Sequence, residues 1–463
     1  MNYEEFIVGK SQIGNNSGFK PKFLPDFLFD FQKSLVDWSI KKGRAAVFAD
    51  CGLGKTLMQL VWSQNIVEHT NKPGLILTPL SVGAQTVREG KKFGIDCKQS
   101  RDGTIQSKIT ITNYQQLHKF NPADFEWCAC DESSILKNFN GEIKAQITEF
   151  IRRMKYRSLW TATAAPNDYI ELGTSSEALG ELGYMDMLAR FFKNAQNSLH
   201  PSIYRHAGMN FEKLNESAKW RFRGHAEKDF WRWVCSWARA CRKPSDLGFS
   251  DDGYILPKLN IREHIIKCRT KNPDFLFEMP AVGLKEQRHE RRRTVQERCE
   301  MAAQISLSKK SPIMLWGALN DECDLMEELI PNSRQISGNQ SDEEKEETLL
   351  AWLNGEFDAI ISKATIIGFG INAQHCHRQT YFPSHSFEQW YQCIRRCWRF
   401  GQNNPVEVDV ISSEGESNVL SNMSRKAAAA EKMFEHLVSL INNELKIERK
   451  TKNETKLKKP SWL

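Results

Sequence analysis

A glycine-rich segment near the start of the chain has the residue types of a phosphate-binding loop. It follows an apolar run, precedes a helical pattern, and reads Ala49-Asp50-Cys51-Gly52-Leu53-Gly54-Lys55-Thr56. Glycines let a backbone fold around phosphates and point its N–H groups inward. We expect Lys55 to reach the β- and γ-phosphates of a nucleotide and Thr56 to hold Mg²⁺. The alternative is a chance glycine-rich turn, and the flanking strand and helix patterns argue against it.

A pair of neighbouring carboxylates is the second candidate for chemistry. Asp131 and Glu132 follow the apolar run 127–130. A carboxylate at a strand end is well placed to bind Mg²⁺ through water, and its neighbour can polarise an attacking water. We therefore assign Asp131 to the metal and Glu132 to the base. Most such pairs are solvated loop charges, but this one lies downstream of Lys55 after two intervening strands.

Two arginines near the end of the second half are the third candidate. Gln392 is followed by Arg396, Arg399 and the dipeptide Gly401-Gln402. The spacing predicts that Arg396 and Arg399 lie about one turn apart on one helical face. Two guanidinium groups there can reach across a cleft to a γ-phosphate and stabilise transition-state charge. The alternative is a basic helix face with solvated arginines.

These residues must be positioned by an alternation of buried strands and helices. Apolar strand-like runs occur at 45–48, 75–78, 109–112, 127–130 and 158–161, and a second series occurs at 261–266, 313–316, 334–337, 359–362, 379–382 and 406–410. Strands that alternate with helices predict parallel sheets covered by helices. We therefore predict an α/β fold with two lobes and a helical insertion between them.

The predicted organisation has five parts. They are a flexible leader (1–20), a nucleotide-binding lobe one (21–170), a mainly helical insertion (171–256), lobe two (257–412), and a helix with a basic tail (413–463). The insertion contains Trp231, Trp233 and Trp237, whose spacing forms no single helical stripe. We favour packing over base stacking for these tryptophans.

In this order the motifs resemble those of superfamily 2 helicases, specifically the Swi/Snf-like branch of double-stranded DNA translocases and its compact phage-type members. The resemblance covers about residues 24–412. It implies two tandem RecA-like lobes that clamp ATP and Mg²⁺ between them. Lobe one would supply the phosphate loop, from Asp50 to Thr56, and the two carboxylates, and lobe two would supply Arg396 and Arg399.

The same resemblance assigns roles to further residues. Gln32 matches the adenine-reading glutamine, and Gly370 lies in the segment that resembles motif V and is assigned to the nucleotide. Three motifs would contact a nucleic-acid strand or couple it to the ATP site, and their residues are Thr78 and Pro79, Thr112 and Asn113, and Thr161 and Thr163.

The chain also departs from the family pattern. Arg395 stands where the family usually has Asp, and Trp398 where it often has His. Ser133-Ser134 replaces Ala-His after the acidic pair. No departure removes a group that the chemistry requires, but together they leave the branch and the tightness of ATP-to-DNA coupling open.

Composition limits the class of protein. The chain has 463 residues, 40% of them hydrophobic and 26% charged, with a net charge of +7. This composition supports globular domains and is compatible with a phosphate-backbone partner. No apolar run approaches the roughly 20 residues of a membrane helix, and we see no signal peptide, so we expect no membrane partner. The twelve scattered cysteines fit a reducing compartment, so we expect a cytoplasmic protein of a bacterium or phage-infected cell, with a nuclear location as the alternative.

The predicted function is ATP-dependent movement on DNA, with duplex DNA favoured and little sequence specificity. Phosphate contacts carry little sequence information, which is the reason for the second expectation. One alternative is an ATP-dependent RNA helicase, and the other is a nucleic-acid-binding clamp or scaffold that uses ATP only as a conformational switch. No nuclease or specificity module is evident, so a protein partner is expected to supply the biological task.

Overall fold

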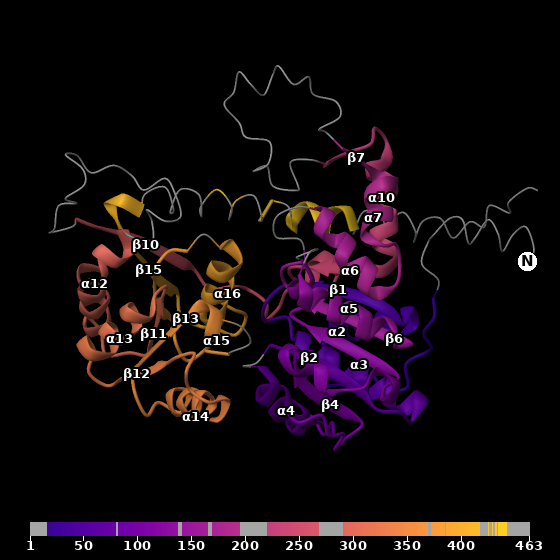
Figure 1. The fold of residues 1–463 in the computed structure, drawn as a ribbon, viewed down its shortest axis with the longest axis horizontal. Helices are drawn as coiled ribbons and strands as arrows, with labels where there is room; N and C mark the ends of the chain where they lie inside the picture. The colour runs from indigo at the N-terminus through magenta and orange to yellow at the C-terminus, as the bar shows by residue number, and fades with distance from the viewer. Residues whose placement is uncertain are drawn as a thin grey trace, which may run out of the picture.

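Two parallel sheets with helices on their faces lie side by side and form the two lobes of the protein (Figure 1). The computed structural model describes residues 16–79, 82–137, 141–164, 169–194, 220–267, 290–368, 372–384 and 386–416, and near the C-terminus 425, 428, 431–432 and 434–441. Within these ranges, no helix combines the length and hydrophobicity that crossing a bilayer requires.

Lobe one is built on a seven-stranded parallel sheet. Its strands, in spatial order, are β3 (Lys98–Gln99), β4 (Ile109–Asn113), β2 (Gly74–Thr78), β5 (Trp127–Asp131), β6 (Tyr156–Thr161), β1 (Arg44–Ala49) and β9 (Ala238–Cys241). β2, β4, β5 and β6 are buried along their whole length, because helices cover both faces of the sheet. Since parallel strands end at the same edge, the ends of β1, β5 and β6 meet there, as the pairing of β6 with both other strands requires.

Helices cover this sheet and lead into the phosphate loop. They are α2 (Asp30–Lys42), α3 (Lys55–Thr70), α4 (Gly83–Lys92) and α5 (Glu142–Arg152), with the 3₁₀ turns η2 (Tyr114–Lys119), η3 (Pro122–Asp124) and η4 (Ser133–Lys137). α2 ends at Gly43, whose φ of 77° lets the chain turn directly into β1.

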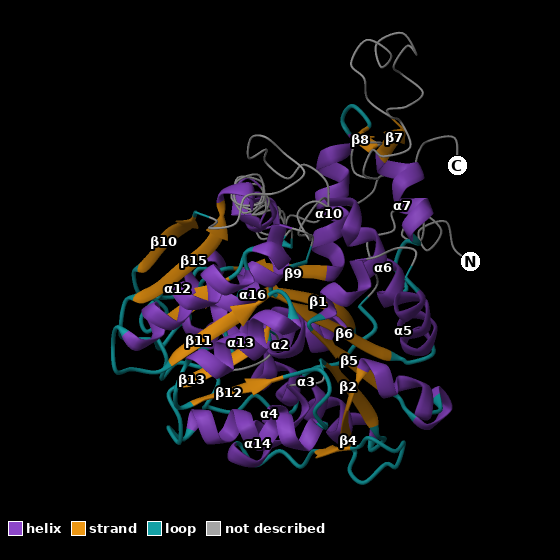
Figure 2. Cartoon of the chain, turned by 60° about the vertical axis from the view of Figure 1, so that its left-hand side comes forward, coloured by secondary structure: helices purple, strands orange, loops and turns teal. Residues whose placement is uncertain are grey.

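Lobe two repeats the design with a six-stranded parallel sheet. Its spatial order is β10 (Leu259–Ile266), β15 (Val406–Ser413), β14 (Arg378–Tyr381), β11 (Ile313–Gly317), β13 (Ala359–Lys363) and β12 (Ser333–Ile336). Its helices are α12 (Val295–Leu307), α13 (Asn320–Leu329), α14 (Asp342–Leu353), α15 (Ala364–Ile367) and α16 (Phe387–Cys397), followed after β15 by the 3₁₀ turn η9 (Glu414–Glu416). In Figures 1 and 2, α16 lies on the side of lobe two that faces lobe one, and α14 lies near α4.

The segment between the lobes is largely helical and rises above lobe one (Figure 1). It contains the turn η5 (Tyr169–Glu171), α6 (Leu172–Leu179), α7 (Tyr184–Phe191), the antiparallel pair β7 (Phe192–Asn194) and β8 (Trp220–Phe222), α10 (Ala226–Trp237), and the turn η8 (Pro244–Leu247). Trp231, Trp233 and Trp237 are at most 4% exposed and belong to one hydrophobic core with α7. The prediction that these tryptophans pack is therefore confirmed.

The last strand of this segment corrects the expectation of a separate insertion. β9 follows α10 directly and pairs in parallel with β1, so residues within the predicted insertion complete the sheet of lobe one. Ala238, Ala240 and Cys241 are fully buried there. Their small side chains fit beside the alanines of β1, but they form too short a run to stand out after the aromatic helix.

A helix near the C-terminus, residues 434–441, returns to lobe one. Leu437, Val438 and Ile441 share the hydrophobic core that contains Trp231. Arg242 adds ion pairs of 3.0 and 2.9 Å to Glu431 and Glu435. The chain after lobe two is therefore anchored on the segment between the lobes.

Candidate active site between the lobes

The phosphate loop connects β1 to α3 in a conformation that only glycine adopts easily. Gly52 and Gly54 have φ values of 88° and 79°. A Cβ at Gly54 would lie 2.4 Å from Nε2 of Gln32, and one at Gly52 would lie 3.0 Å from Cδ2 of Phe400. Phe400 belongs to lobe two, so the loop is in contact with the second lobe.

Lys55 is held inside this loop. Its ammonium donates to the carbonyl oxygens of Ala49 at 2.9 Å and Asp50 at 3.2 Å. Leu53 is fully buried, and the half-buried Thr56 follows Lys55 in the first turn of α3. The side chains predicted to meet phosphate and Mg²⁺ therefore stand together at the N-terminus of a 16-residue helix, where the helix dipole favours an anion.

Gln32 supports the phosphate loop through hydrogen bonds to backbone atoms. Its Nε2 donates to the carbonyl of Leu53 at 2.9 Å, and its Oε1 accepts from the backbone N–H of Phe29 at 3.0 Å. Both ends of the amide thus bind protein backbone, and the side chain ties the start of α2 to the phosphate loop. Adenine reading by Gln32 stays a prediction.

The two carboxylates stand at the end of β5, beside the loop. Both are buried, and Glu132 has a φ of 47°, which is unusual for a residue with a side chain. Burial, followed by the adjacent Glu132 carboxylate, raises the pKa of Asp131 to about 7, and Lys55 opposes this. The Tyr114 hydroxyl donates to the Asp131 carbonyl and fixes the strand end.

Oxygen ligands of this kind fit Mg²⁺. A hydroxyl at Thr56 and a carboxylate at Asp131 are hard donors, and Mg²⁺ prefers few protein ligands together with phosphate oxygens. Two adjacent buried carboxylates, with the pKa of Asp131 raised by burial, form an environment whose negative charge a divalent cation would offset. The residues present therefore fit the predicted metal.

The hydroxyls at the end of β6 connect to the same carboxylates. Thr161 Oγ1 donates to Glu132 Oε2 at 3.4 Å and accepts from the Thr163 N–H at 3.0 Å. Both threonines are buried. They lie beside the carboxylate pair, in direct contact with Glu132, and their contact with nucleic acid stays a prediction.

Lobe two presents its arginines at the C-terminal end of α16, in an arrangement that corrects one expectation. Arg396 lies in the last turn, where it donates to the carbonyl and side-chain oxygens of Gln392 at 2.8 and 2.6 Å. α16 ends at Cys397, so Arg399 does not continue the helical face on which both arginines were predicted. Gly401, with a φ of 87°, lets the chain turn away there.

Arg399 lies against the phosphate loop. A Cβ at Gly52 would be 3.6 Å from Cβ of Arg399. Burial, followed by the nearby Arg396, lowers the pKa of Arg399 to about 10. Two neighbouring arginines beside the predicted phosphate loop are electrostatically favourable partners for a phosphate.

A buried ion pair between the lobes escaped the sequence analysis. Arg395, noted only as a departure from the family pattern, lies 2.8 Å from Asp50 of the phosphate loop. The Tyr391 hydroxyl donates to the same carboxylate. Burial acts to lower the pKa of Arg395, but the Asp50 carboxylate outweighs it and the pKa is raised. The available signal was one of complementary charge, an aspartate in the phosphate loop and an arginine where the family usually has aspartate.

Glu89 of α4 was missed as well. Burial, opposed by Gln85 and by Arg399, raises its pKa, and its charge also contributes to the raised pKa of Asp131. It therefore lies within the electrostatic environment of both halves of the site. Nothing in its local sequence distinguishes it from other helix-surface glutamates.

Further contacts between the lobes surround this centre. Arg88 lies 3.1 Å from Glu346 of α14, Arg101 pairs with Glu343, and Lys137 pairs with Glu388 of α16. A cavity of about 730 Å³ opens beside Asp50 and Phe400 and is lined also by Tyr254, Arg242 and residues of the C-terminal helix.

The residues predicted to contact nucleic acid meet at one edge of lobe one. Thr78 and Asn113 are direct neighbours on β2 and β4. The side chains of Thr78, Thr112 and Asn113 are buried, and Asn113 Oδ1 accepts from the Gln116 N–H at 3.0 Å to cap η2. Pro79 is half-buried beside them. These side chains hold the strand ends, and strand contact at this edge stays a prediction.

Some predicted residues lie outside the described part of the chain. These are Gly370, residues 1–15 of the predicted leader, and the predicted basic tail. Among the described arginines that precede α12, Arg291 binds Glu416 at 2.8 Å and Arg293 binds Glu290 at 2.9 Å. Those two arginines serve lobe two internally.

Comparison with known proteins identifies the fold. No protein-family profile and no curated protein matches the chain. The structure is similar to that of S. cerevisiae Dbp5 bound to RNA and ADP BeF3, with a TM-score of 0.53, 10% identity, and coverage of 89% of this chain and 98% of that one. A Sulfolobus solfataricus SWI2/SNF2 ATPase core in complex with dsDNA also matches, with a TM-score of 0.40, 17% identity, and coverage of 90% and 97%.

At such low identity the likeness shows the fold alone. The protein has two tandem RecA-like lobes, each a parallel sheet flanked by helices. The predicted fold class is confirmed.

Proposed function

We propose that this protein is a nucleic-acid-dependent ATPase that converts ATP hydrolysis between its lobes into movement on DNA. The observation that carries the proposal is the split site. The phosphate loop of lobe one touches Phe400 and Arg399 of lobe two, while Asp131, Glu132 and Thr161 stand beside it.

Each half of this site has a separate task. Lys55 and the loop N–H groups hold the phosphates, and Thr56 and Asp131 hold Mg²⁺. Transfer of the γ-phosphoryl group from bound ATP to water would release ADP and inorganic phosphate. Glu132 would orient that water and accept its proton, while Arg399, with Arg396 nearby, would offset charge that develops on the phosphate. Hydrolysis therefore requires both lobes.

Movement follows from the same division. Closure of the lobes on ATP and opening on product release alternate the grip of each lobe on a strand. Thr161 is the last residue of β6 and donates to Glu132. A movement of Glu132 would therefore displace the end of β6, at the same sheet edge where Thr78 and Asn113 lie. Phosphate contacts at that edge would make binding weakly sequence-specific and strongly salt-dependent.

The test is ATP turnover with no nucleic acid, duplex DNA, single-stranded DNA and RNA in parallel. We expect duplex DNA to stimulate turnover most, and Lys55→Ala to abolish the stimulated rate. Unchanged stimulated turnover in Lys55→Ala sinks the proposal.

The same assay separates the alternatives. Strongest stimulation by RNA would make the protein an RNA helicase, and tight ATP binding without turnover would make it an ATP-operated clamp. Triplex displacement measured beside fork unwinding then distinguishes translocation on a duplex from strand separation.

A further inference from the structure

We propose that Arg395 is a positioning residue whose buried ion pair with Asp50 sets the register of the lobe-two arginines on the phosphate loop. The inference rests on the proposed function, because the register matters only if both lobes act on one nucleotide. It concerns a residue that occupies a position where the resemblance led us to expect aspartate.

The pair forms at the base of the phosphate loop. Arg395 Nη2 lies 2.8 Å from Asp50 Oδ2, and the same nitrogen donates to the Cys51 carbonyl at 3.0 Å. The other carboxylate oxygen, Oδ1, accepts from the Cys51 N–H at 2.6 Å and from the Tyr391 hydroxyl. One guanidinium of lobe two thus contacts both backbone and side chain of the loop.

Both side chains of the pair are almost completely shielded from solvent. The side chains of Arg395 and Asp50 are 1% and 6% exposed. Three aromatic rings surround the guanidinium, those of Tyr391, Trp398 and Phe400, at 5.6, 5.0 and 5.8 Å from its carbon to the ring centroids. A charge in such a place is tolerated only when its partner is present and aligned.

This requirement selects one closed arrangement of the lobes. When the lobes separate, water can solvate both charges. When they close out of register, each charge is buried without its partner, which is strongly unfavourable. Closure is therefore favourable only where Asp50 and Arg395 meet, and that arrangement brings Arg399 against Gly52.

Arg395 is well placed to transmit this register. It precedes Arg396 in the last turn of α16, and the chain continues within four residues to Arg399. Arg395 itself is occupied by Asp50 and Cys51, so it acts on the reaction through these neighbours.

The experiment compares Arg395→Gln, Asp50→Asn and the double variant, with Arg88→Gln as the matched control. Arg88 also pairs across the lobes, but its side chain is 47% exposed.

Each single variant leaves one buried charge unpaired, so we expect kcat for ATP to fall at least about tenfold with KM changed less than about threefold. The double variant removes both charges and should recover to within about fivefold of wild type. Arg88→Gln should stay within about twofold.

Two readouts keep this inference distinct from the proposed function. Small-angle X-ray scattering of the nucleotide-free proteins reports lobe separation whether or not ATP is hydrolysed, and we expect a larger radius of gyration for the singles only. Wild type without ATPase activity would count against the proposed function alone. An active wild type with Arg395→Gln unchanged in kcat and compactness overturns the inference, as does a double variant no better than the worse single. If Arg395→Gln does not fold, the isosteric Asp50→Asn carries the same test.

Discussion

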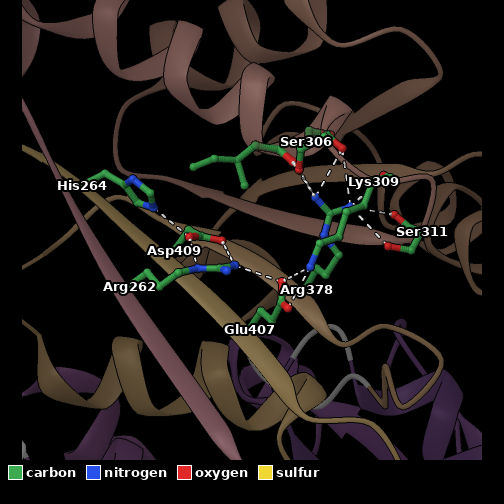
Figure 3. Close-up of polar contacts among 10 residues, drawn as sticks. Arg262, His264, Ser306, Lys309, Ser311, Arg378, Glu407 and Asp409 are labelled. Carbon is green, nitrogen blue, oxygen red and sulfur yellow. Dashed lines mark hydrogen bonds and ion pairs between the residues drawn. The ribbon is translucent and has the colours of Figure 1, made fainter.

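Two ionic networks of this protein use the same types of side chain for different purposes. In lobe two, Arg262 of β10 binds Asp409 and Glu407 of β15, and His264 lies 2.7 Å from Asp409 (Figure 3). Lys309 binds Glu407 at 2.8 Å, all within one lobe. The pair of Asp50 and Arg395 instead joins two lobes and is buried.

The two networks control different properties of the protein. The network within lobe two fastens the edge strand β10 to β15. Figure 3 shows Arg378 close by, and its guanidinium donates to backbone oxygens such as that of Lys309 at 2.9 Å. Loss of this network should affect the stability of lobe two and leave the nucleotide site intact. Loss of the interlobe network should affect turnover and leave each lobe folded. The following predictions test that division.

The largest effect is expected from Glu132→Gln at the interlobe site. The amide retains the shape but cannot accept a proton, so we expect ATP turnover to fall about 100-fold or more. Removing one of two crowded carboxylates should leave the melting temperature equal or higher. Single-turnover hydrolysis and calorimetry on the same sample measure both, and a wild-type rate would remove Glu132 from the catalytic role.

A large effect on stability, rather than on ATP turnover, is expected from Arg298→Met inside lobe two. Arg298 and Glu322 form a fully buried pair at 2.6 Å between α12 and α13. Breaking it leaves an unpaired buried carboxylate, so we expect lobe two to lose about 3–5 kcal/mol. Scanning calorimetry should show the lobe-two transition at lower temperature. A fall in kcat with an unchanged temperature of the lobe-two transition would contradict the expectation that this network affects stability and not turnover.

Asp409→Asn should have a smaller effect on stability. It weakens the bonds to Arg262 and His264, and because both partners are partly exposed, water replaces part of the interaction. We expect a loss of about 1–2 kcal/mol in urea unfolding, with ATP turnover at a permissive temperature unchanged. Glu407→Gln, which affects the more exposed part of the same network, provides the comparison.

The smallest effect is expected from Glu346→Gln, which faces Arg88 across the lobes. Exposed pairs contribute about 0–1 kcal/mol, so kcat should stay within about twofold. High salt should change the small difference in kcat between this variant and wild type only slightly. A large loss would mean that lobe docking depends on the number of interlobe pairs rather than on the buried one.

Much of the fold could be predicted because buried parallel strands leave continuous apolar runs. The runs at 45–48 and 127–130 correspond to β1 and β5 within one or two residues. β3 and β9 were missed for physical reasons. β3 has two residues, and Ala238–Cys241 follows a helix without any turn residue, so only pairing with β1 reveals it as a strand.

Some features of the candidate site could also be predicted from the sequence, and others could not. The loop glycines and the carboxylates were predictable because their chemistry requires those residue types next to a strand end. The place of Arg399 was not, since a spacing of three residues predicts a helical face only if the helix continues beyond Cys397. The buried state of Thr78, Thr112 and Asn113 also depends on how neighbouring strands end.

Residue types and their spacing are enough to predict the local units of this protein: a glycine-rich loop after a strand, a carboxylate pair after another, and arginines near the end of a helix. Local units follow from neighbouring residues, whose backbone and side-chain preferences act over a few positions. The contacts of Asp50 with Arg395 and of Arg399 with the loop at Gly52 are visible only in the folded protein. Those contacts depend on how two separately folded lobes dock, which is set by complementary charge and shape between residues far apart in the chain.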